Sequence, residues 1–139
     1  MNEKHQLGFV HKFIPSAGSK DQNSVTLLLL HGTGGDETDL IPIARMLDIT
    51  NASILSPRGK VIENGMPRYF RRFSEGILDI ADLKFSTNEL AEFVQNASKT
   101  YALNLNRIVA IGYSNGANIA ASVLLLRPEI LSNAILFRP

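Results

Sequence analysis

Ser114 stands in a sequence context that is typical of a nucleophile. It is the central residue of Gly112-Tyr113-Ser114-Asn115-Gly116, with an apolar run before the motif and a helix-forming run after it. This pattern predicts a strand-to-helix turn whose strained backbone lifts the serine hydroxyl above a sheet. Side chains at positions 112 and 116 would collide with the neighbouring strand or helix, so both positions need glycine. We therefore predict that Ser114 is the nucleophile of an acyl-transfer reaction.

A glycine-dense loop fits the same chemistry. The segment His31-Gly32-Thr33-Gly34-Gly35 directly follows the apolar run 25–30. Acyl transfer builds negative charge on a carbonyl oxygen, and two fixed backbone N–H groups stabilise that charge. Where a serine occupies such a turn, one donor belongs to the next residue, here Asn115, and the other to the loop after a central strand. We predict Thr33 as the loop donor, with Gly34 as the second choice.

Each motif also has an ordinary structural explanation. Ser114 can be the N-cap of a helix in a plain strand-to-helix turn, although this does not explain both flanking glycines. The glycine loop can bind a phosphate, but a phosphate-binding loop of the P-loop type ends in Lys-Ser or Lys-Thr. Here the loop continues with Asp36 and Glu37, whose negative charges oppose phosphate binding.

The three histidines do not supply a catalytic base in the expected order. In hydrolases whose nucleophilic serine lies on such a strand-to-helix turn, the catalytic triad follows the chain order Ser, then Asp or Glu, then His. His5, His11 and His31 all precede Ser114, and the acid that follows it is Glu129. We expect His31 to support the glycine loop by hydrogen bonding, and His5 and His11 to lie at the surface or in an edge strand.

A basic and aromatic cluster lies in the long segment after the predicted strand 52–56. One interpretation is a pocket rim that meets the acyl or anionic part of a substrate, and the other is a solvated loop whose aromatic side chains attach it to the core. The cluster comprises Arg68, Arg71 and Arg72 with Tyr69, Phe70 and Phe73. The candidate substrate pocket consists of three residues of this cluster and the nearby Met66, namely Met66, Arg68, Phe70 and Arg71.

Strands that alternate with helices must position these residues. The pattern predicts an α/β protein with a mostly parallel sheet and right-handed crossovers. Thr38 is the predicted N-cap of a short helix that reaches Leu47, and Ser86 to Glu89 match a capping box that opens a helix ending near Tyr101. A further helix is expected at 117–126. The expected strands are 8–14 at an edge, 25–30, 52–56, 107–111 and 133–137, and 58–85 is read as a long functional loop.

Composition excludes several other classes of protein. The 139 residues correspond to one domain, 1–139, and 45% hydrophobic with 19% charged residues indicates a globular chain. A formal charge of +1 does not favour a nucleic-acid binder. The lack of cysteine excludes a disulfide scaffold and a thiolate metal site. No run reaches the ~18 apolar residues of a membrane span, and no signal peptide is recognised. We expect a cytoplasmic protein.

The combined motifs resemble the carboxylesterase/phospholipase family of α/β-hydrolases, and most closely its MhqD-like bacterial branch. The resemblance is carried by Thr26 to Gly35, Pro57-Arg58-Gly59, Glu63 to Arg72 and Gly112 to Ala120. It implies a three-layer fold, Ser114 as nucleophile, backbone donors at Thr33 and Asn115, and no metal or cofactor. The glycines it matches in the loop and the elbow are Gly32, Gly34, Gly112 and Gly116.

The same resemblance implies about two hundred residues, with the acid and the base in the last third. We therefore expect this chain to be the N-terminal two thirds of a C-terminally truncated hydrolase domain, with the last strands and helices missing. The predicted function is hydrolysis of a small-molecule ester or thioester through an acyl-enzyme on Ser114, and the fragment alone is expected to be inactive. The alternative is a hydrolase-like fragment without activity that serves as a binding module or a homodimer formed through its open edge.

Overall fold

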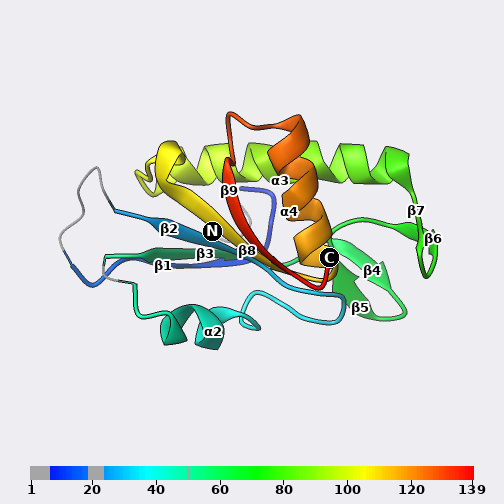
Figure 1. Cartoon of the computed structure of the whole chain (residues 1–139), viewed down its shortest axis with the longest axis horizontal. Coiled ribbons are helices and arrows are strands. Elements are labelled where there is room, and N and C mark those ends of the chain that lie inside the picture. Colours follow the sequence, from blue (N-terminus) through cyan, green and yellow to red (C-terminus); the bar gives the residue numbers. More distant parts are fainter. Residues whose placement is uncertain (1–6, 19–23, 50) are drawn as a thin grey trace.

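A five-stranded sheet forms the centre of the computed structural model, which describes residues 7–18, 24–49 and 51–139 (Figure 1). The strand order is β1-β3-β2-β8-β9, in which β1 is antiparallel to β3 and the other neighbours are parallel. The fold class predicted from the sequence is confirmed. The strand bounds are His11–Ile14 (β1), Thr26–Leu30 (β2), Ser53–Pro57 (β3), Ile108–Tyr113 (β8) and Asn133–Phe137 (β9).

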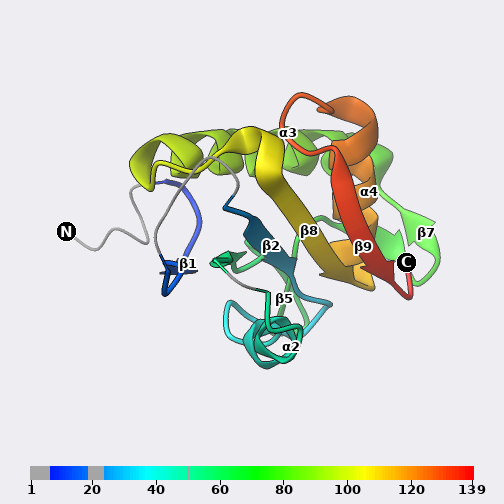
Figure 2. The same ribbon diagram turned by 60° about the vertical axis from the view of Figure 1, so that its left-hand side comes forward.

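Helices cover both faces of this sheet. The long helix α3 (Ile80–Thr100) and the helix α4 (Asn115–Leu126) lie on one face, and the short helix α2 (Ile41–Met46) lies on the other (Figures 1 and 2). A larger core cluster, which includes Phe93, fills the α3–α4 side, and a smaller one, which includes Leu29, fills the α2 side. All residues of β2 are buried because this strand has covered neighbours on both sides and both faces.

The pairing of β2 with β8 brings the two sequence motifs together. The strands are parallel, and Leu30 at the end of β2 is in register with Gly112. The carboxyl ends of parallel strands meet at the same edge of a sheet, so the glycine loop after β2 and the turn after β8 emerge side by side. The two motifs therefore lie beside each other at this edge of the sheet.

The predicted cap of α2 is wrong. The helix begins at Ile41, and Leu40 occupies the N-cap position without a side-chain hydrogen bond. Thr38 instead donates its hydroxyl to Asp36 Oδ1 at 2.7 Å, and its N–H donates to the same oxygen at 2.8 Å. A local turn around an aspartate competes with helix capping, and here the turn is formed.

The predicted start of α3 is also wrong. The helix begins at Ile80, and the Asp79 carboxylate caps it by accepting the N–H of Asp82 at 3.0 Å. Ser86 and Thr87 lie inside the helix and are buried. The hydroxyls of Thr87 and Ser122 are 2.7 Å apart, which joins α3 to α4. The motif that resembles a capping box is therefore a small polar contact between two helices.

The segment between β3 and α3 is more ordered than the predicted loop. It forms the hairpin of β4 (Val61–Glu63) with β5 (Met66–Arg68) and the hairpin of β6 (Arg72–Ser74) with β7 (Ile77–Leu78). After α3, a 3₁₀ turn at Leu105–Arg107 leads into β8. Both hairpins lie beyond the carboxyl ends of the central strands, on the side where α4 begins (Figure 1).

The edge strand β9 agrees with its predicted bounds. It pairs with β8, and its other edge faces no strand among the described residues. Ile135 and Phe137 are about half exposed on one face of it. A homodimer through this edge stays a prediction. Within the described residues, no helix combines the length and the apolar character that crossing a bilayer requires.

Candidate active site

Ser114 occupies a strained turn between β8 and α4. Its backbone angles are φ 54° and ψ −113°, and its side chain makes no capping hydrogen bond to the helix. The N–H of Ser114 donates to the carbonyl of Phe137 at 2.8 Å, which ties the turn to β9. A positive φ at a non-glycine residue costs energy and persists only where the surroundings hold it. An ordinary N-cap serine, with an extended backbone and a capping bond, does not describe this position.

The two flanking glycines leave room for backbone on either side. A Cβ on Gly112 would lie 2.6 Å from the carbonyl oxygen of Gly116, and one on Gly116 would overlap the carbonyl of Leu30. Backbone atoms cannot move away as the end of a flexible side chain can. The close approach of α4 to β2 and β8 therefore depends on glycine at both positions.

The start of α4 offers unpaired donors next to Ser114. The first intrahelical bond runs from the N–H of Asn118 to the carbonyl of Ser114 at 3.0 Å. The helix therefore supplies no acceptor for the N–H groups of Asn115, Gly116 and Ala117. Asn115 follows the serine directly as the first residue of α4, and its role as an oxyanion donor stays a prediction.

The glycine loop lies against the elbow, and most of its donors are already used. A Cβ on Gly32 would come within 3.5 Å of the Ser114 Cβ. The N–H of Gly34 donates to the carbonyl of Pro67 at 2.9 Å, and that of Gly35 to the carbonyl of Gly32 at 3.0 Å. Within the described residues the N–H of Thr33 makes no such bond. Gly34, the second choice from the sequence, thus has its donor occupied, whereas Thr33 does not.

The peptide that carries the Thr33 N–H has a fixed orientation. Its carbonyl, that of Gly32, accepts the Gly35 N–H and lies 2.6 Å from His31 Nδ1. The described peptide bonds are all trans. In a trans peptide the N–H points away from the C=O, so holding the Gly32 carbonyl on one side aims the Thr33 N–H to the other.

His31 is a support of the loop, as its place in the sequence indicates. It is 1% exposed, and its Nε2 lies 3.0 Å from the N–H of Gly59, which donates to it. Because Nε2 accepts, the ring is neutral and Nδ1 carries the proton that it donates to the Gly32 carbonyl. Burial lowers the pKa of His31, which favours this neutral form. Both ring nitrogens are engaged, so His31 has none free to act as a base.

The other histidines lie away from the elbow. His11 sits in the edge strand β1, as expected, but it is 1% exposed and not on the surface. Its ring nitrogens lie 2.8 Å from the Phe9 carbonyl and 2.7 Å from the Tyr101 hydroxyl. The buried position follows from its packing against Phe93 of α3. His5 lies outside the described residues.

A salt bridge holds the far end of the glycine loop. The carboxylate of Glu37 accepts from Arg58 Nη2 at 2.7 Å and from Arg58 Nε at 2.9 Å. The Glu37 side chain is 7% exposed and that of Arg58 is 43% exposed. The hydrogen bond to Glu37 raises the pKa of Arg58. Together with His31, this pair attaches both ends of the loop to the turn that follows β3.

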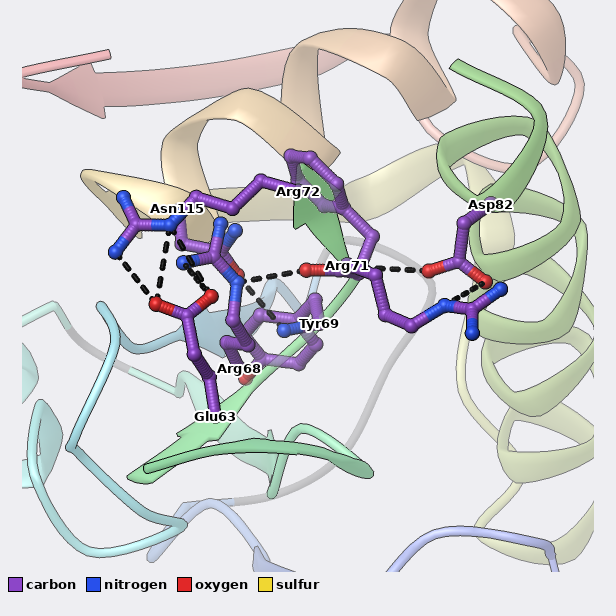
Figure 3. Close-up of polar contacts among 8 residues, drawn as sticks. Glu63, Arg68, Tyr69, Arg71, Arg72, Asp82 and Asn115 are labelled. Atoms are coloured by element: carbon purple, nitrogen blue, oxygen red, sulfur yellow. Dashed lines mark hydrogen bonds and ion pairs between the residues drawn. The ribbon is translucent and has the colours of Figure 1, made fainter. Parts of the chain in front are cut away.

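Tyr69 connects the elbow to the loop, and sequence reasoning did not single it out. Its N–H donates to Asn115 Oδ1 at 2.7 Å (Figure 3). Its hydroxyl donates to the Pro57 carbonyl at 2.8 Å and accepts the N–H of His31 at 3.3 Å. Because these partners come from three distant segments, no local motif marks Tyr69. Its position in the basic and aromatic cluster was the available signal.

The candidate substrate pocket is only partly exposed. Arg68 is 3% exposed, and Phe70 is completely buried in the larger core cluster. Arg68 donates from Nε to the Phe70 carbonyl at 2.7 Å and pairs with Glu63 at 3.3 Å (Figure 3). These two side chains are therefore not exposed at a rim in this structure, and their place in a substrate pocket stays a prediction.

Met66 and Arg71 remain accessible. A Cβ on Gly34 would lie 3.4 Å from Met66 Sδ, so this methionine borders the glycine loop. Arg71 is exposed, and its ion pair with Asp79 is long, at 3.9 Å. Its ion pair with Asp82 is also long, at 3.6 Å (Figure 3). Arg72 instead forms a close pair with Glu63 at 2.7 Å, and its hydrogen bonds lower the pKa of that carboxyl. Of the predicted set, Met66 therefore borders the glycine loop at Gly34.

A family model for phospholipases and carboxylesterases matches residues 11–138. The chain belongs to this family. It is 49% identical over 128 residues to the Bacillus subtilis (strain 168) hydrolase MhqD. The aligned region covers 92% of this chain and 62% of MhqD. The family predicted from the sequence motifs is confirmed.

Solved structures of related proteins show the same fold. The crystal structure of the Bacillus cereus carboxylesterase matches with a TM-score of 0.88 and 50% identity, over 98% of this chain and 64% of that one. A carboxylesterase from Mesorhizobium loti matches with a TM-score of 0.76 and 37% identity, over 81% and 53%. The fold is the α/β-hydrolase fold. The chain spans less than two thirds of the length of these relatives.

Proposed function

We propose that this chain carries the nucleophile and the oxyanion site of a serine-dependent hydrolase of carboxylic esters or thioesters. The observation that carries the proposal is the pairing of a strained Ser114 with a loop in which the Thr33 N–H is left unpaired. The matches to hydrolases support this class of enzyme and do not favour a binding module without activity.

In the proposed reaction, Ser114 Oγ attacks the carbonyl carbon of the ester. The C–O or C–S bond to the leaving group breaks, and the alcohol or thiol departs with a proton. Water then attacks the acyl-enzyme, releases the acid and returns the proton to Ser114. The N–H groups of Thr33 and Asn115 stabilise the oxyanion in both steps.

Serine requires a base for this step, because a free hydroxyl is a weak nucleophile at neutral pH. Both ring nitrogens of His31 are bonded within the fold, and His11 contacts Phe9 and Tyr101 instead. We therefore assign the base to a residue outside the described ranges. The substrate that we propose is a small-molecule ester, with Met66 beside its acyl group because this side chain borders Gly34.

Active-site labelling tests the proposal. The complete protein, as its gene encodes it, is treated with a fluorophosphonate probe, and the labelled peptide is identified by mass spectrometry. We expect labelling at Ser114, hydrolysis of p-nitrophenyl acetate, and loss of both in Ser114→Ala by about 10³-fold or more.

Ser74→Ala is the matched control, because Ser74 is an exposed serine in β6. It should be labelled and active like the unmodified protein. Labelling at another residue, or unchanged hydrolysis by Ser114→Ala, would show that the nucleophile is assigned wrongly.

A further inference from the structure

Tyr69 lies between the two segments that carry the proposed oxyanion donors. It is 3% exposed, its backbone N–H is bonded to the Asn115 side chain, and its hydroxyl is bonded to the backbone N–H of His31. Its ring centroid is 4.7 Å from that of His31. We propose that Tyr69 is a positioning residue that fixes the spacing between the Thr33 and Asn115 donors. This inference rests on the proposed function.

The two donors belong to different parts of the fold. The Asn115 N–H opens α4, whereas the Thr33 N–H lies in the loop after β2. Tyr69 connects the segments that carry them: its N–H donates to Asn115 Oδ1 at 2.7 Å, and its hydroxyl accepts the N–H of His31, two residues before Thr33, at 3.3 Å. Oxyanion stabilisation depends on donors that are in place before charge develops, so this spacing controls the rate.

The Tyr69 hydroxyl uses both of its hydrogen-bonding functions. It has one proton, which it donates to the Pro57 carbonyl at 2.8 Å, and it accepts from His31 through a lone pair. Burial raises the pKa of Tyr69, so the hydroxyl stays protonated and keeps its donor role. The hydroxyl thereby holds the end of β3 and the start of the glycine loop at one distance.

The Asn115 side chain has a feature that stability alone does not explain. Within the described residues, Asn115 Nδ2 is the one buried side-chain nitrogen or oxygen without a hydrogen-bond partner. A buried donor left unpaired is destabilising. The other half of the amide, Oδ1, holds the Tyr69 N–H. The bond to the Tyr69 N–H explains why position 115 is an asparagine. This bond orients the elbow relative to the segment after β5.

The experiment compares two tyrosine-to-phenylalanine variants of the complete protein. Tyr69→Phe removes the hydroxyl and keeps the ring. Tyr101→Phe is the matched control, because the Tyr101 hydroxyl is also bonded to a histidine, His11, but at the opposite end of α3 from the elbow (Figure 1). For each variant, the rate of Ser114 labelling is measured against probe concentration, together with the thermal midpoint.

We expect Tyr69→Phe to lower the saturating labelling rate about 10-fold, with the half-saturating concentration unchanged within about 2-fold. Tyr101→Phe should keep the labelling rate within about 2-fold even where its midpoint falls. A Tyr69→Phe protein with a lower midpoint and an unchanged labelling rate would mean that Tyr69 is only structural, and would overturn the inference.

A double variant tests whether Tyr69 and Asn115 act through one chain of bonds. Asn115→Ala keeps the backbone N–H and removes only the side chain. If both residues act through the same connection, Tyr69→Phe with Asn115→Ala should be no more than about 2-fold slower than the slower single variant. Rates that multiply would show two independent effects and contradict the inference.

Amide exchange measured by NMR separates this inference from the proposed function. If the unmodified protein is not labelled at Ser114, the proposed function fails, but the geometry can still be tested. Tyr69→Phe should speed hydrogen exchange of the His31, Gly34 and Gly35 amides, which are bonded in the glycine loop, about 10-fold, and Tyr101→Phe should change none of them. Unchanged exchange at Gly34 and Gly35 in Tyr69→Phe would overturn the positioning role.

Discussion

The two turns that meet at the candidate site are held in place by different forces. In the elbow, backbone atoms of β2, β8 and α4 approach so closely that only glycine fits at 112 and 116. In the glycine loop, a Cβ at Gly34 would meet only the side chain of Met66, at 3.4 Å. Hydrogen bonds to Gly59, Pro67 and Tyr69 hold that loop instead.

This difference indicates which changes each turn tolerates. Close packing of backbone on backbone has no flexible side chain that can give way, so the elbow should not accept a single added methyl group. At position 34 the glycine loop has space for a methyl group, and the loop should be sensitive to the loss of a polar partner. The predictions below test this contrast.

The largest effect is expected for Gly116→Ala. The added Cβ would overlap the Leu30 carbonyl, so the free energy of unfolding should fall by at least about 3 kcal/mol. Gly34→Ala should cost only about 1–2 kcal/mol, because its φ of 89° is unfavourable for alanine. Urea unfolding measures both.

Gly76→Ala is the control for backbone strain alone. Gly76 has a φ of 79° and nothing within 4 Å of an added Cβ. It should resemble Gly34→Ala to within about 0.5 kcal/mol. Equal costs at positions 116 and 34 would show that the proposed contrast between the turns is wrong.

The next effect concerns the salt bridge of the loop. Arg58→Met leaves the mostly buried Glu37 carboxylate without its partner, and we expect a loss of about 1–2 kcal/mol, limited because Arg58 is partly exposed. The double variant with Glu37→Gln should recover most of this loss. Urea unfolding with amide exchange at residues 33–37 checks it, and a double variant as unstable as Arg58→Met would contradict the assignment.

Replacement of the strained serine should have a smaller effect, in the opposite direction. Ser114→Gly relieves the cost of a φ of 54°, so we expect it to be about 1 kcal/mol more stable than Ser114→Ala. Glycine also gains freedom in the unfolded chain, which offsets part of the gain. A glycine variant less stable than the alanine variant would indicate that the elbow is not strained.

The smallest expected effect is a pH dependence that originates in the loop. Burial lowers the pKa of His31 below 6.5, while the hydrogen bond to the Gly32 carbonyl and the nearby acidic side chains partly oppose the shift. The unfolded state therefore binds the proton more readily. The stability that His31 contributes is complete above about pH 6.5 and is lost as the pH falls from there through the folded-state pKa.

Urea unfolding at pH 7.5 and 5.5 measures this dependence. His31→Asn, which cannot titrate in this range, should lose less stability between the two pH values than the unmodified chain. Asp36, whose pKa is lowered chiefly by the Thr38 hydroxyl, contributes a similar loss only near and below pH 3.8, so the two windows are separate. An equal pH dependence in His31→Asn would exclude His31 as its source.

Most of the elements could be predicted from sequence, and the errors have a common cause. The strands at 25–30 and 133–137 carry short apolar runs with turn signals on both sides, and the structure places β2 and β9 there. Thr38 and Ser86 carry good capping signals, but Thr38 bonds to Asp36 in a local turn, and Ser86 lies buried inside α3 beside Thr87, whose hydroxyl contacts Ser122. Capping patterns describe local competition, and tertiary contacts decided it.

The sequence by itself determined the elbow, because its strand, its glycines, its serine and its helix are contiguous and the steric requirement is local. Only the tertiary structure decided which loop donor is left unpaired. The Pro67 carbonyl accepts the N–H of Gly34, and His31 orients the peptide that carries the Thr33 N–H. Tyr69 connects the elbow to the glycine loop. The bonds of Pro67 and Tyr69 link segments far apart in the chain, and neither spacing nor periodicity records them.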